Sequence, residues 1–401
     1  MKDDTKEKRR PGRYFRYGIL ASLAVLVISL GLVLTPGPPP EAPEPAFSER
    51  ARAAALAETL QLRTTGSRLA DSVSGAERQA LLRTVTLLTT QARALAAPDQ
   101  NAPGQKTSDQ GQSATSAASG TASGVPSASA GGTTAGPDSP AGLVAALSAS
   151  GGQRLTDAEA SDGGMARLLA AVGTAQLLQA SSLAPAVGAA APPAPALPVT
   201  APLPVTTPSA GAQAAGEDSC RAAPAASGTA AEPVAPTATP EGALAMTVKT
   251  EAETVYGYQV AVARLEGAAA DSASQLLARH EAVLAEAEAL SRAQCAAIPP
   301  REAGYTLGPL FLESPASGLG SLEAGTLPVY GDLVALSDGS TRQWAISGLL
   351  AAANRAILWG ADPGPLPGIV VNTAQLPELP QDGRGQDPTA PPAPPRQSDA
   401  G

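Results

Sequence analysis

Hydrophobic positions recur at steps of three and four residues along residues 239–369, and this spacing predicts helices that pack against one another. In the first predicted helix the repeating positions are Leu244, Val248, Glu251, Val255, Tyr258, Val262 and Leu265. All of them are apolar or aromatic except Glu251. The pattern therefore raises the question of how a carboxylate is accommodated on a helix face that should be buried.

Three more helices are predicted after the first. Their repeating positions are Ala273, Leu276, His280, Val283, Ala287 and Leu290, then Leu322, Thr326, Tyr330, Leu333 and Leu336, and finally Ile346, Leu350, Ala353 and Ile357. Helix starts are predicted at Thr239-Pro240, at Ser272 with Gln275, and at Ser340 with Gln343, because these residue types cap helix N-termini. Gly267 is expected to end the first helix. Short connections within each helix pair predict an all-α fold with an antiparallel four-helix bundle over residues 239–369.

The rest of the chain divides by composition. Residues 48–185 are Ala-rich and carry a weaker helical pattern, clearest at Leu81, Val85, Leu88, Ala92 and Leu95. We expect four short helices there, interrupted by a disordered insert at 98–140. Few large apolar residues occur in that insert, in the 186–238 linker or in the Pro-rich 370–401 tail, so burial cannot offset the entropy of ordering them. Residues 36–47 are predicted to form a Pro-rich stalk.

The longest uncharged apolar run is residues 18–34, which would span about 26 Å as a helix, near the thickness of the bilayer's hydrocarbon core. Seven Lys and Arg residues precede it, against three acidic residues. The positive-inside rule then predicts a basic cytoplasmic tail at 1–17, a transmembrane helix at 18–35, and an extracytoplasmic remainder. The alternative is a cleaved signal peptide, although no small-x-small cleavage site follows the run.

Charge and composition narrow the possible partners. The chain has 401 residues, a net charge of −9, and only 3% aromatic residues. An acidic chain has no general attraction for nucleic acid, which requires a basic field. Ala/Pro/Thr tracts in an exported chain are typical of spacers that cross the wall of a high-GC Gram-positive bacterium. We therefore expect contact with the membrane through residues 18–35, and a cell-wall or envelope partner.

The two cysteines, Cys220 and Cys295, would lie on the oxidising side of the membrane in this topology. Cys295 is expected at the end of the second helix, and Cys220 lies in the linker before the first. Those two ends are neighbours in an antiparallel helix pair, so we predict a Cys220–Cys295 disulfide. Two free thiols are the alternative.

The bundle region resembles a known family. The stretches VYGYQVAVARL, LLARHEAVLAEAEAL, LPVYGDLVAL and AILWGADPGPLPG are similar to the actinobacterial ferritin-like family named domain of unknown function 4439. The resemblance covers about residues 241–369, a third of the chain, and does not extend to residues 48–185. It implies a ferritin-like four-helix bundle, and the family name assigns no activity.

A ferritin-like fold raises the possibility of a two-metal centre, which takes a Glu from each of two helices and a Glu-x-x-His pair from each of the other two. The chain has a single His, and Leu277 stands where the Glu of that pair would be. The predicted fourth helix has no Asp, Glu or His. The metal candidates are then Glu251 and His280, with Glu323 or Asp332 possible on the third helix.

With a turn near residues 267–271, Glu251 would lie about 22 Å from the turn and His280 about 13 Å, so the two would not be level. Tyr258 is the better match for His280. We therefore expect His280 to bond a Tyr hydroxyl or a carbonyl. Glu251 is expected near the open end of the bundle, within reach of water, backbone donors or the Tyr330 hydroxyl.

These observations predict a membrane-anchored envelope protein whose ferritin-like domain is a non-catalytic binding or structural module without a cofactor. The alternative is a metal-binding or redox protein that keeps part of a ferritin-like site. The count of metal ligands favours the first interpretation.

Overall fold

The computed structural model describes residues 22–23, 44–96, 137–193 and 239–379. The chain divides into two compact units, residues 1–45 and residues 46–401. Within the described ranges, no helix is long and apolar enough to span a membrane. The predicted transmembrane helix at 18–35 lies outside the described residues, apart from the helical pair 22–23. All the structure discussed below belongs to the second unit.

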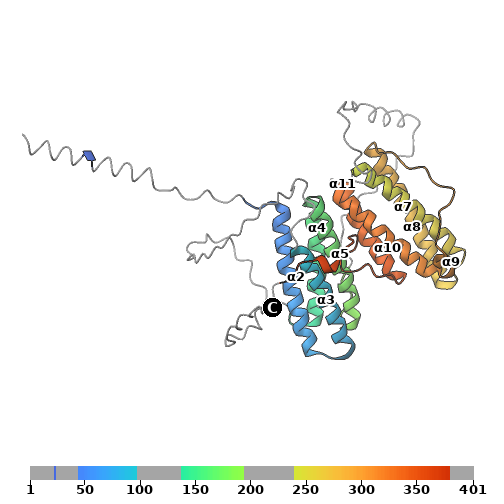
Figure 1. Ribbon diagram of the computed structural model, residues 1–401. Coiled ribbons are helices and arrows are strands. Elements are labelled where there is room, and N and C mark those ends of the chain that lie inside the picture. The colour runs from blue at the N-terminus through green and yellow to red at the C-terminus, as the bar shows by residue number, and fades with distance from the viewer. Residues whose placement is uncertain (1–21, 24–43, 97–136, 194–238, 380–401) are drawn as a thin grey trace, which may run out of the picture. The chain divides into compact units, whose positions relative to one another are not determined.

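The second unit begins with two helical hairpins. The first consists of α2 (Phe47–Ser72) and α3 (Gly75–Ala96), and the second of α4 (Pro140–Ala160) and α5 (Gly163–Ala186). The two hairpins pack together through α2 with α4 and α3 with α5 (Figure 1). These helices have 21 to 26 residues, so the expectation of short helices is wrong. Alanine explains the difference, since it buries little area but is the strongest helix former.

Four long helices and one short one make up the second half. They are α7 (Pro240–Val262), α8 (Gly267–Ala293), α9 (Pro309–Glu313), α10 (Pro315–Leu336) and α11 (Gly339–Leu358). The helices α7 and α8 form one hairpin, α10 and α11 form another, and α7 packs on α10. The described part of the chain contains helices and no strand, which confirms the all-α fold.

The helix starts were only partly predictable. Thr239 caps α7 as expected, since its hydroxyl accepts a hydrogen bond from the Gly242 backbone N–H. The two predicted capping boxes are wrong, because α8 and α11 begin earlier, at Gly267 and Gly339. Both glycines have positive φ, 57° and 51°, a conformation that favours glycine. Each helix thus starts at a glycine that reverses the chain, and Gly267 begins α8 instead of ending the first helix.

The two halves share one hydrophobic core. A single cluster of buried side chains includes Leu169 of α5 together with Leu333 of α10 and Leu349 of α11. Polar contacts join the same helices, since the Arg167 guanidinium on α5 binds Asp332 of α10 at 2.6 Å. The Ala-rich half is therefore packed onto the second half and is not a separate bundle.

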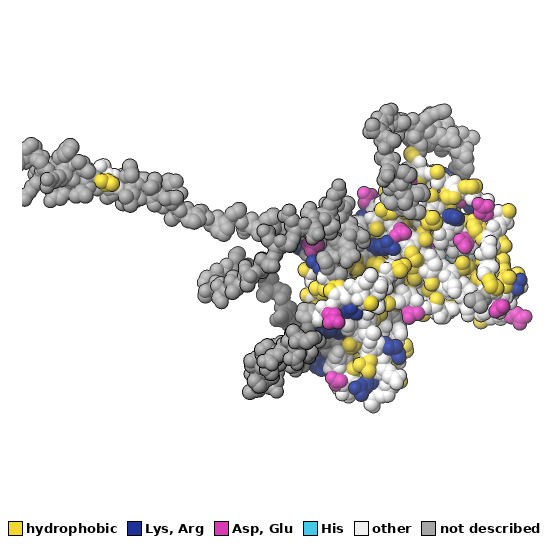
Figure 2. Space-filling model, in the orientation of Figure 1, with side chains coloured by type: hydrophobic (Ala, Val, Ile, Leu, Met, Phe, Trp, Pro, Cys, Tyr) yellow, Lys and Arg dark blue, Asp and Glu magenta, His cyan; other side chains and the backbone are white. Residues whose placement is uncertain are grey.

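The segment after α11 crosses to the first half of the unit. It includes a 3-10 helix, η1 (Thr373–Gln375), and its backbone carbonyls accept hydrogen bonds from Gln91, Arg93 and Arg167. The prediction of a disordered tail is wrong for residues 370–379. The hydrogen bonds to this segment order a stretch whose composition alone predicts disorder. On the face shown in Figure 2, acidic and basic side chains are interspersed.

Candidate functional site

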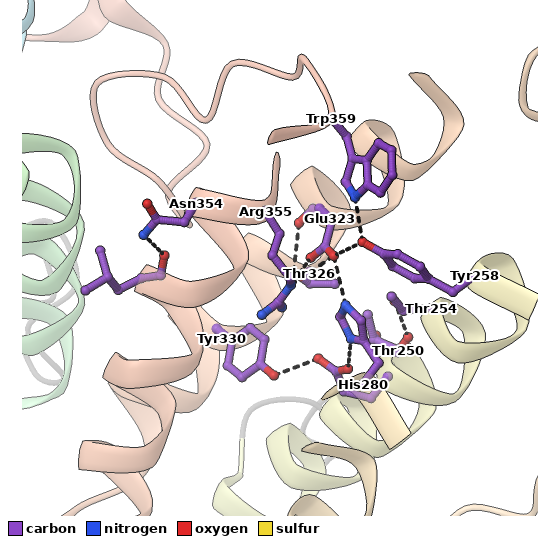
Figure 3. Close-up of polar contacts among 12 residues, drawn as sticks. Thr250, Thr254, Tyr258, His280, Glu323, Thr326, Tyr330, Asn354, Arg355 and Trp359 are labelled. Atoms are coloured by element: carbon purple, nitrogen blue, oxygen red, sulfur yellow. Dashed lines mark hydrogen bonds and ion pairs between the residues drawn. The ribbon is translucent and has the colours of Figure 1, made fainter. Parts of the chain in front are cut away.

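One ionisable side chain from each of the four long helices of the second half reaches the same buried point. These are Glu251 of α7, His280 of α8, Glu323 of α10 and Arg355 of α11. The first three have no exposed surface, and Arg355 is 8% exposed. Figure 3 shows His280, Glu323 and Arg355 pointing toward one another. We call these four residues the ionic cluster.

His280 lies between the two carboxylates and bonds both. Its Nδ1 is 2.7 Å from Glu251 Oε2, and its Nε2 is 2.8 Å from Glu323 Oε1. A carboxylate only accepts, so both ring nitrogens donate and the ring is an imidazolium. Burial on its own lowers the pKa of His280, but the hydrogen bonds to Glu251 and Glu323 and their negative charges outweigh it. The pKa therefore lies above its ordinary value of 6.5.

Glu323 accepts from three neighbours. Besides His280, the Tyr258 hydroxyl donates to Oε1 at 2.6 Å, and the Arg355 Nε lies 2.9 Å from each carboxylate oxygen. Burial on its own raises the pKa of Glu323. The His280 hydrogen bond and the positive charge of Arg355 outweigh that effect and hold the pKa below its ordinary value. Glu323 is thus the anionic centre of the ionic cluster.

Two tyrosines enclose the cluster. The Tyr330 hydroxyl donates to Glu251 Oε1 at 2.6 Å, and Tyr258 in turn accepts from the Trp359 indole N–H at 2.8 Å. Burial, helped by the neighbouring carboxylates, raises the pKa of both Tyr258 and Tyr330. Both hydroxyls therefore remain protonated and act as donors. The hydrogen bonds run without a break from Tyr330 through His280 to Trp359.

The formal charges of the ionic cluster cancel. Glu251 and Glu323 contribute two negative charges, and the His280 imidazolium and Arg355 contribute two positive ones. Ion pairs without solvent are tolerated only when they are neutralised and hydrogen-bonded. The cluster meets these conditions except at one atom, Arg355 Nη2, which is buried without a hydrogen-bond partner.

The structure corrects the expected placement of Glu251 and His280. The two residues are paired, because α7 ends at Val262 and α8 begins at Gly267, so the turn lies a few residues earlier than expected. Glu251 is 11 residues before Val262 and His280 is 13 residues after Gly267, which places them within one helical turn of each other. Glu251 is also fully buried instead of lying near an open end.

Some of the other expectations about the partners of these residues are confirmed, and some are wrong. The contact of Tyr330 with Glu251 is confirmed. The expectation that His280 bonds a Tyr hydroxyl or a carbonyl is wrong, since its partners are carboxylates, although the Tyr258 ring lies 4.9 Å from the His280 ring between centroids. Of the two candidates on the third helix, Glu323 belongs to the cluster, and Asp332 pairs with Arg167.

Arg355 and Trp359 were not predicted as site residues. A signal for both exists in the α11 sequence, where steps of four and three connect Trp344, Gly348, Ala352, Arg355 and Trp359. Trp344, Ala352 and Arg355 are buried, and a Cβ at Gly348 would overlap the Tyr330 ring. An arginine on such a buried face predicts a carboxylate partner in the same way that Glu251 predicts a cation.

The ionic cluster does not fit a two-metal centre. Both nitrogens of its one imidazole already donate to carboxylates, and the fourth helix contributes a guanidinium where that centre needs an acidic ligand. Within the described ranges, no three His, Cys, Asp or Glu side chains are arranged to hold a metal ion. The available ligand atoms are therefore engaged with one another.

Cys295 follows the end of α8 with a φ of 57°, and it is not a free thiol. Cys220 lies outside the described residues. The Cys220–Cys295 disulfide therefore stays a prediction.

Comparison with known proteins finds a family match in the part of the chain that carries the ionic cluster. Residues 243–371 match the model of a domain of unknown function, DUF4439. The match agrees with the resemblance seen in the sequence, and it includes every residue of the ionic cluster. No curated protein and no solved structure matches the chain.

Proposed function

We propose that the protein is a membrane-anchored envelope protein whose ferritin-like domain serves as a non-catalytic binding or structural module. The observation that carries the proposal is the complete burial of Glu251, His280 and Glu323. These are the groups that could do acid–base or metal chemistry in the bundle, and none of their atoms is accessible to a substrate. These groups are hydrogen-bonded to one another across the helices, so the role of the cluster is to hold the four helices together.

The arrangement of α7, α8, α10 and α11 supports the ferritin-like assignment. Two hairpins pack in pairs, and one polar residue from each helix converges at the centre, as the ligands do in ferritin-like metal proteins. Here the converging groups are two anions and two cations. We infer a ferritin-like architecture in which a neutral ionic cluster occupies the position of the metal centre.

Metal analysis of the full chain tests the proposed module. The protein, purified without added metal, is expected to contain no stoichiometric iron, manganese or zinc, and its thermal midpoint is expected to stay unchanged on treatment with a chelator. Stoichiometric metal, lost in both Glu251→Gln and His280→Ala, would overturn the proposal in favour of a metal-binding or redox protein.

Protease accessibility tests the membrane topology. With seven basic residues before the apolar run at 18–34, the positive-inside rule places the C-terminus outside the membrane. Protease added to intact cells or protoplasts should then digest the ferritin-like domain. Protection of that domain would show the opposite orientation, and a mature protein that begins after residue 34 would show a cleaved signal peptide.

A further inference from the structure

We propose that a groove between α3 and the segment after α11 binds a short, extended peptide of the cell envelope that carries both a carboxylate and an ammonium group. The groove lies where the Ala-rich half meets the region that matches the family model, since Arg83 of α3, Gln179 of α5 and Asp362 all line it. Its volume is about 600 Å³, a size typical of ligand sites. The inference deepens the proposed function by naming the partner's chemistry, and it rests on that function for the location of the peptide.

The wall that the segment after α11 forms is held in place by hydrogen bonds within the chain. The Gly364 backbone N–H donates to Asp362 Oδ1 at 2.8 Å, and Gly364 has a φ of 73°, so the chain turns tightly there. Next to this turn, the Pro365 carbonyl accepts from Nε2 of the buried Gln91 on α3 at 3.1 Å. Because the wall is already ordered, a ligand can bind with little loss of conformational entropy in the protein.

Two opposite charges line the groove without pairing with each other. Within the described part of the chain, the exposed Arg83 guanidinium has no hydrogen-bond or ion-pair partner, and the exposed Asp362 carboxylate accepts only from the Gly364 N–H of its own turn. A ligand that carries charges of both signs would complement this pair, and complementary charges give a binding site its specificity. A peptide with free ends carries an ammonium group and a carboxylate.

The uncharged polar groups of the groove offer acceptors to a ligand. The Thr86 and Thr90 hydroxyls donate to backbone carbonyls of α3 at 3.0 and 3.3 Å, so their oxygens keep lone pairs for a ligand. Gln179 donates an amide N–H to the Thr84 hydroxyl, and its carbonyl oxygen remains an acceptor. The ligand should therefore bring several donors, as the N–H groups of a peptide backbone do. Gln79 and Thr90, which both line the groove, lie 11 positions apart on α3, about 16 Å, the length of about five extended residues.

Apolar side chains cover the rest of the groove, and its composition disfavours other classes of ligand. Leu82 is 45% exposed, and together with Leu87 and Pro365 it offers apolar contact to small side chains of a peptide. None of the described lining residues is aromatic, so a nucleic-acid base would find no ring to stack on. A ligand with negative charges alone would be repelled by Asp362.

The test is calorimetric titration of the full chain with pentaalanine, which has one ammonium group and one carboxylate, and with two blocked forms of it. We expect saturable binding of one pentaalanine per chain, and binding about tenfold weaker for the form with a C-terminal amide. Arg83→Met should weaken the binding of pentaalanine about tenfold, the scale of one hydrogen bond between charged groups, and should leave the binding of the amide form unchanged. Arg78→Met is the matched control, because Arg78 is also exposed on α3 but does not line the groove.

A second variant tests the other charge. Asp362→Asn keeps an oxygen that can accept from the Gly364 N–H, so it removes the charge and preserves the turn. It should weaken the binding of pentaalanine and leave the binding of the N-acetylated form unchanged. Arg83 and Asp362 are exposed, so both variants should keep the thermal midpoint of the wild type. If Asp362→Asn lowers that midpoint, the result depends on Arg83→Met.

The outcomes separate this inference from the proposed function. No saturable binding of pentaalanine at millimolar concentration, equal binding by Arg83→Met and Arg78→Met, or binding of an oligosaccharide in place of the peptide would each refute the inference. A metal-free protein whose C-terminus lies outside the membrane, and which binds no pentaalanine, refutes the inference alone. Peptide binding by a protein that contains stoichiometric metal refutes the non-catalytic module alone, and a C-terminus inside the membrane refutes the envelope location of both.

Discussion

Replacing each buried glutamate by glutamine should have very different effects on stability, although the two residues share His280 as a partner. In Glu251→Gln, the amide oxygen can still accept from Tyr330, and the amide N–H can donate to Nδ1 of a neutral His280. The remaining charges, on Glu323 and Arg355, still cancel. We therefore expect a loss of about 1–2 kcal/mol in the free energy of unfolding, the scale of one weakened hydrogen bond.

Glu323→Gln cannot be compensated in this way. Glu323 accepts from His280, Tyr258 and Arg355, and Arg355 has no other acidic partner in the described contacts. An amide would leave the buried guanidinium without an acidic group in direct contact, a change that typically costs about 3–5 kcal/mol. The difference between the two glutamine variants is therefore expected to be about 2–3 kcal/mol.

Urea unfolding of the full chain, followed by circular dichroism, measures this difference. Glu281→Gln provides the matched control, because Glu281 follows His280 on α8 but is exposed, and such surface changes stay within about 0.5 kcal/mol. Equal losses for Glu251→Gln and Glu323→Gln, or a larger loss for Glu251→Gln, would refute the assignment of Glu323 as the anionic centre.

Three further predictions concern pH, the cysteines and the packing of the segment after α11 against α10. The raised pKa of His280 contributes stability that is complete below pH 6.5 and is lost as the pH rises through that pKa. The lowered pKa of Glu323 contributes stability that is present above pH 4.5 and is lost as the pH falls through that pKa. The free energy of unfolding, measured across pH, should therefore include the full contribution of both residues between pH 4.5 and pH 6.5. A Cys220–Cys295 disulfide, worth about 4 kcal/mol by loop entropy, should appear as a cross-linked peptide in non-reducing mapping, and two alkylatable thiols would exclude it. Gly331→Ala should lower the thermal midpoint and reduce the free energy of unfolding by about 1–3 kcal/mol, because its Cβ would lie 2.6 Å from a backbone oxygen of the segment after α11. An unchanged midpoint would contradict this tight packing.

The sequence was sufficient to identify the long helices and most of their buried faces. Leu244, Val248, Glu251 and Tyr258 are all buried as their spacing predicted, because that spacing depends only on local helix geometry. Ile357 is an exception, since it lies near the end of α11 and is 47% exposed. Hydrophobic periodicity predicts which face of a helix is buried. It does not predict the residue at which neighbouring helices stop covering that face.

The partners of the buried polar groups could not be read in the same way. A shift of a few residues in the start of α8 was enough to make Glu251 and His280 seem far apart. Arg355 has a role that ligand patterns do not predict, because acidic residues and histidine are the metal ligands of such bundles and arginine is not. Contacts between α5 and α10, such as Arg167 with Asp332, join residues 165 positions apart, and no local pattern specifies them.

The ionic cluster explains why a glutamate lies on the buried face of α7. The cluster closes only when one residue from each of four helices is level with the others, and we infer that it fixes their register. Replacing Glu251, His280, Glu323 and Arg355 together by leucine or methionine should then leave the helix content almost unchanged and the free energy of unfolding near that of the wild type, while the amide NMR spectrum loses its dispersion. A well-dispersed spectrum from that variant would show that packing alone sets the register.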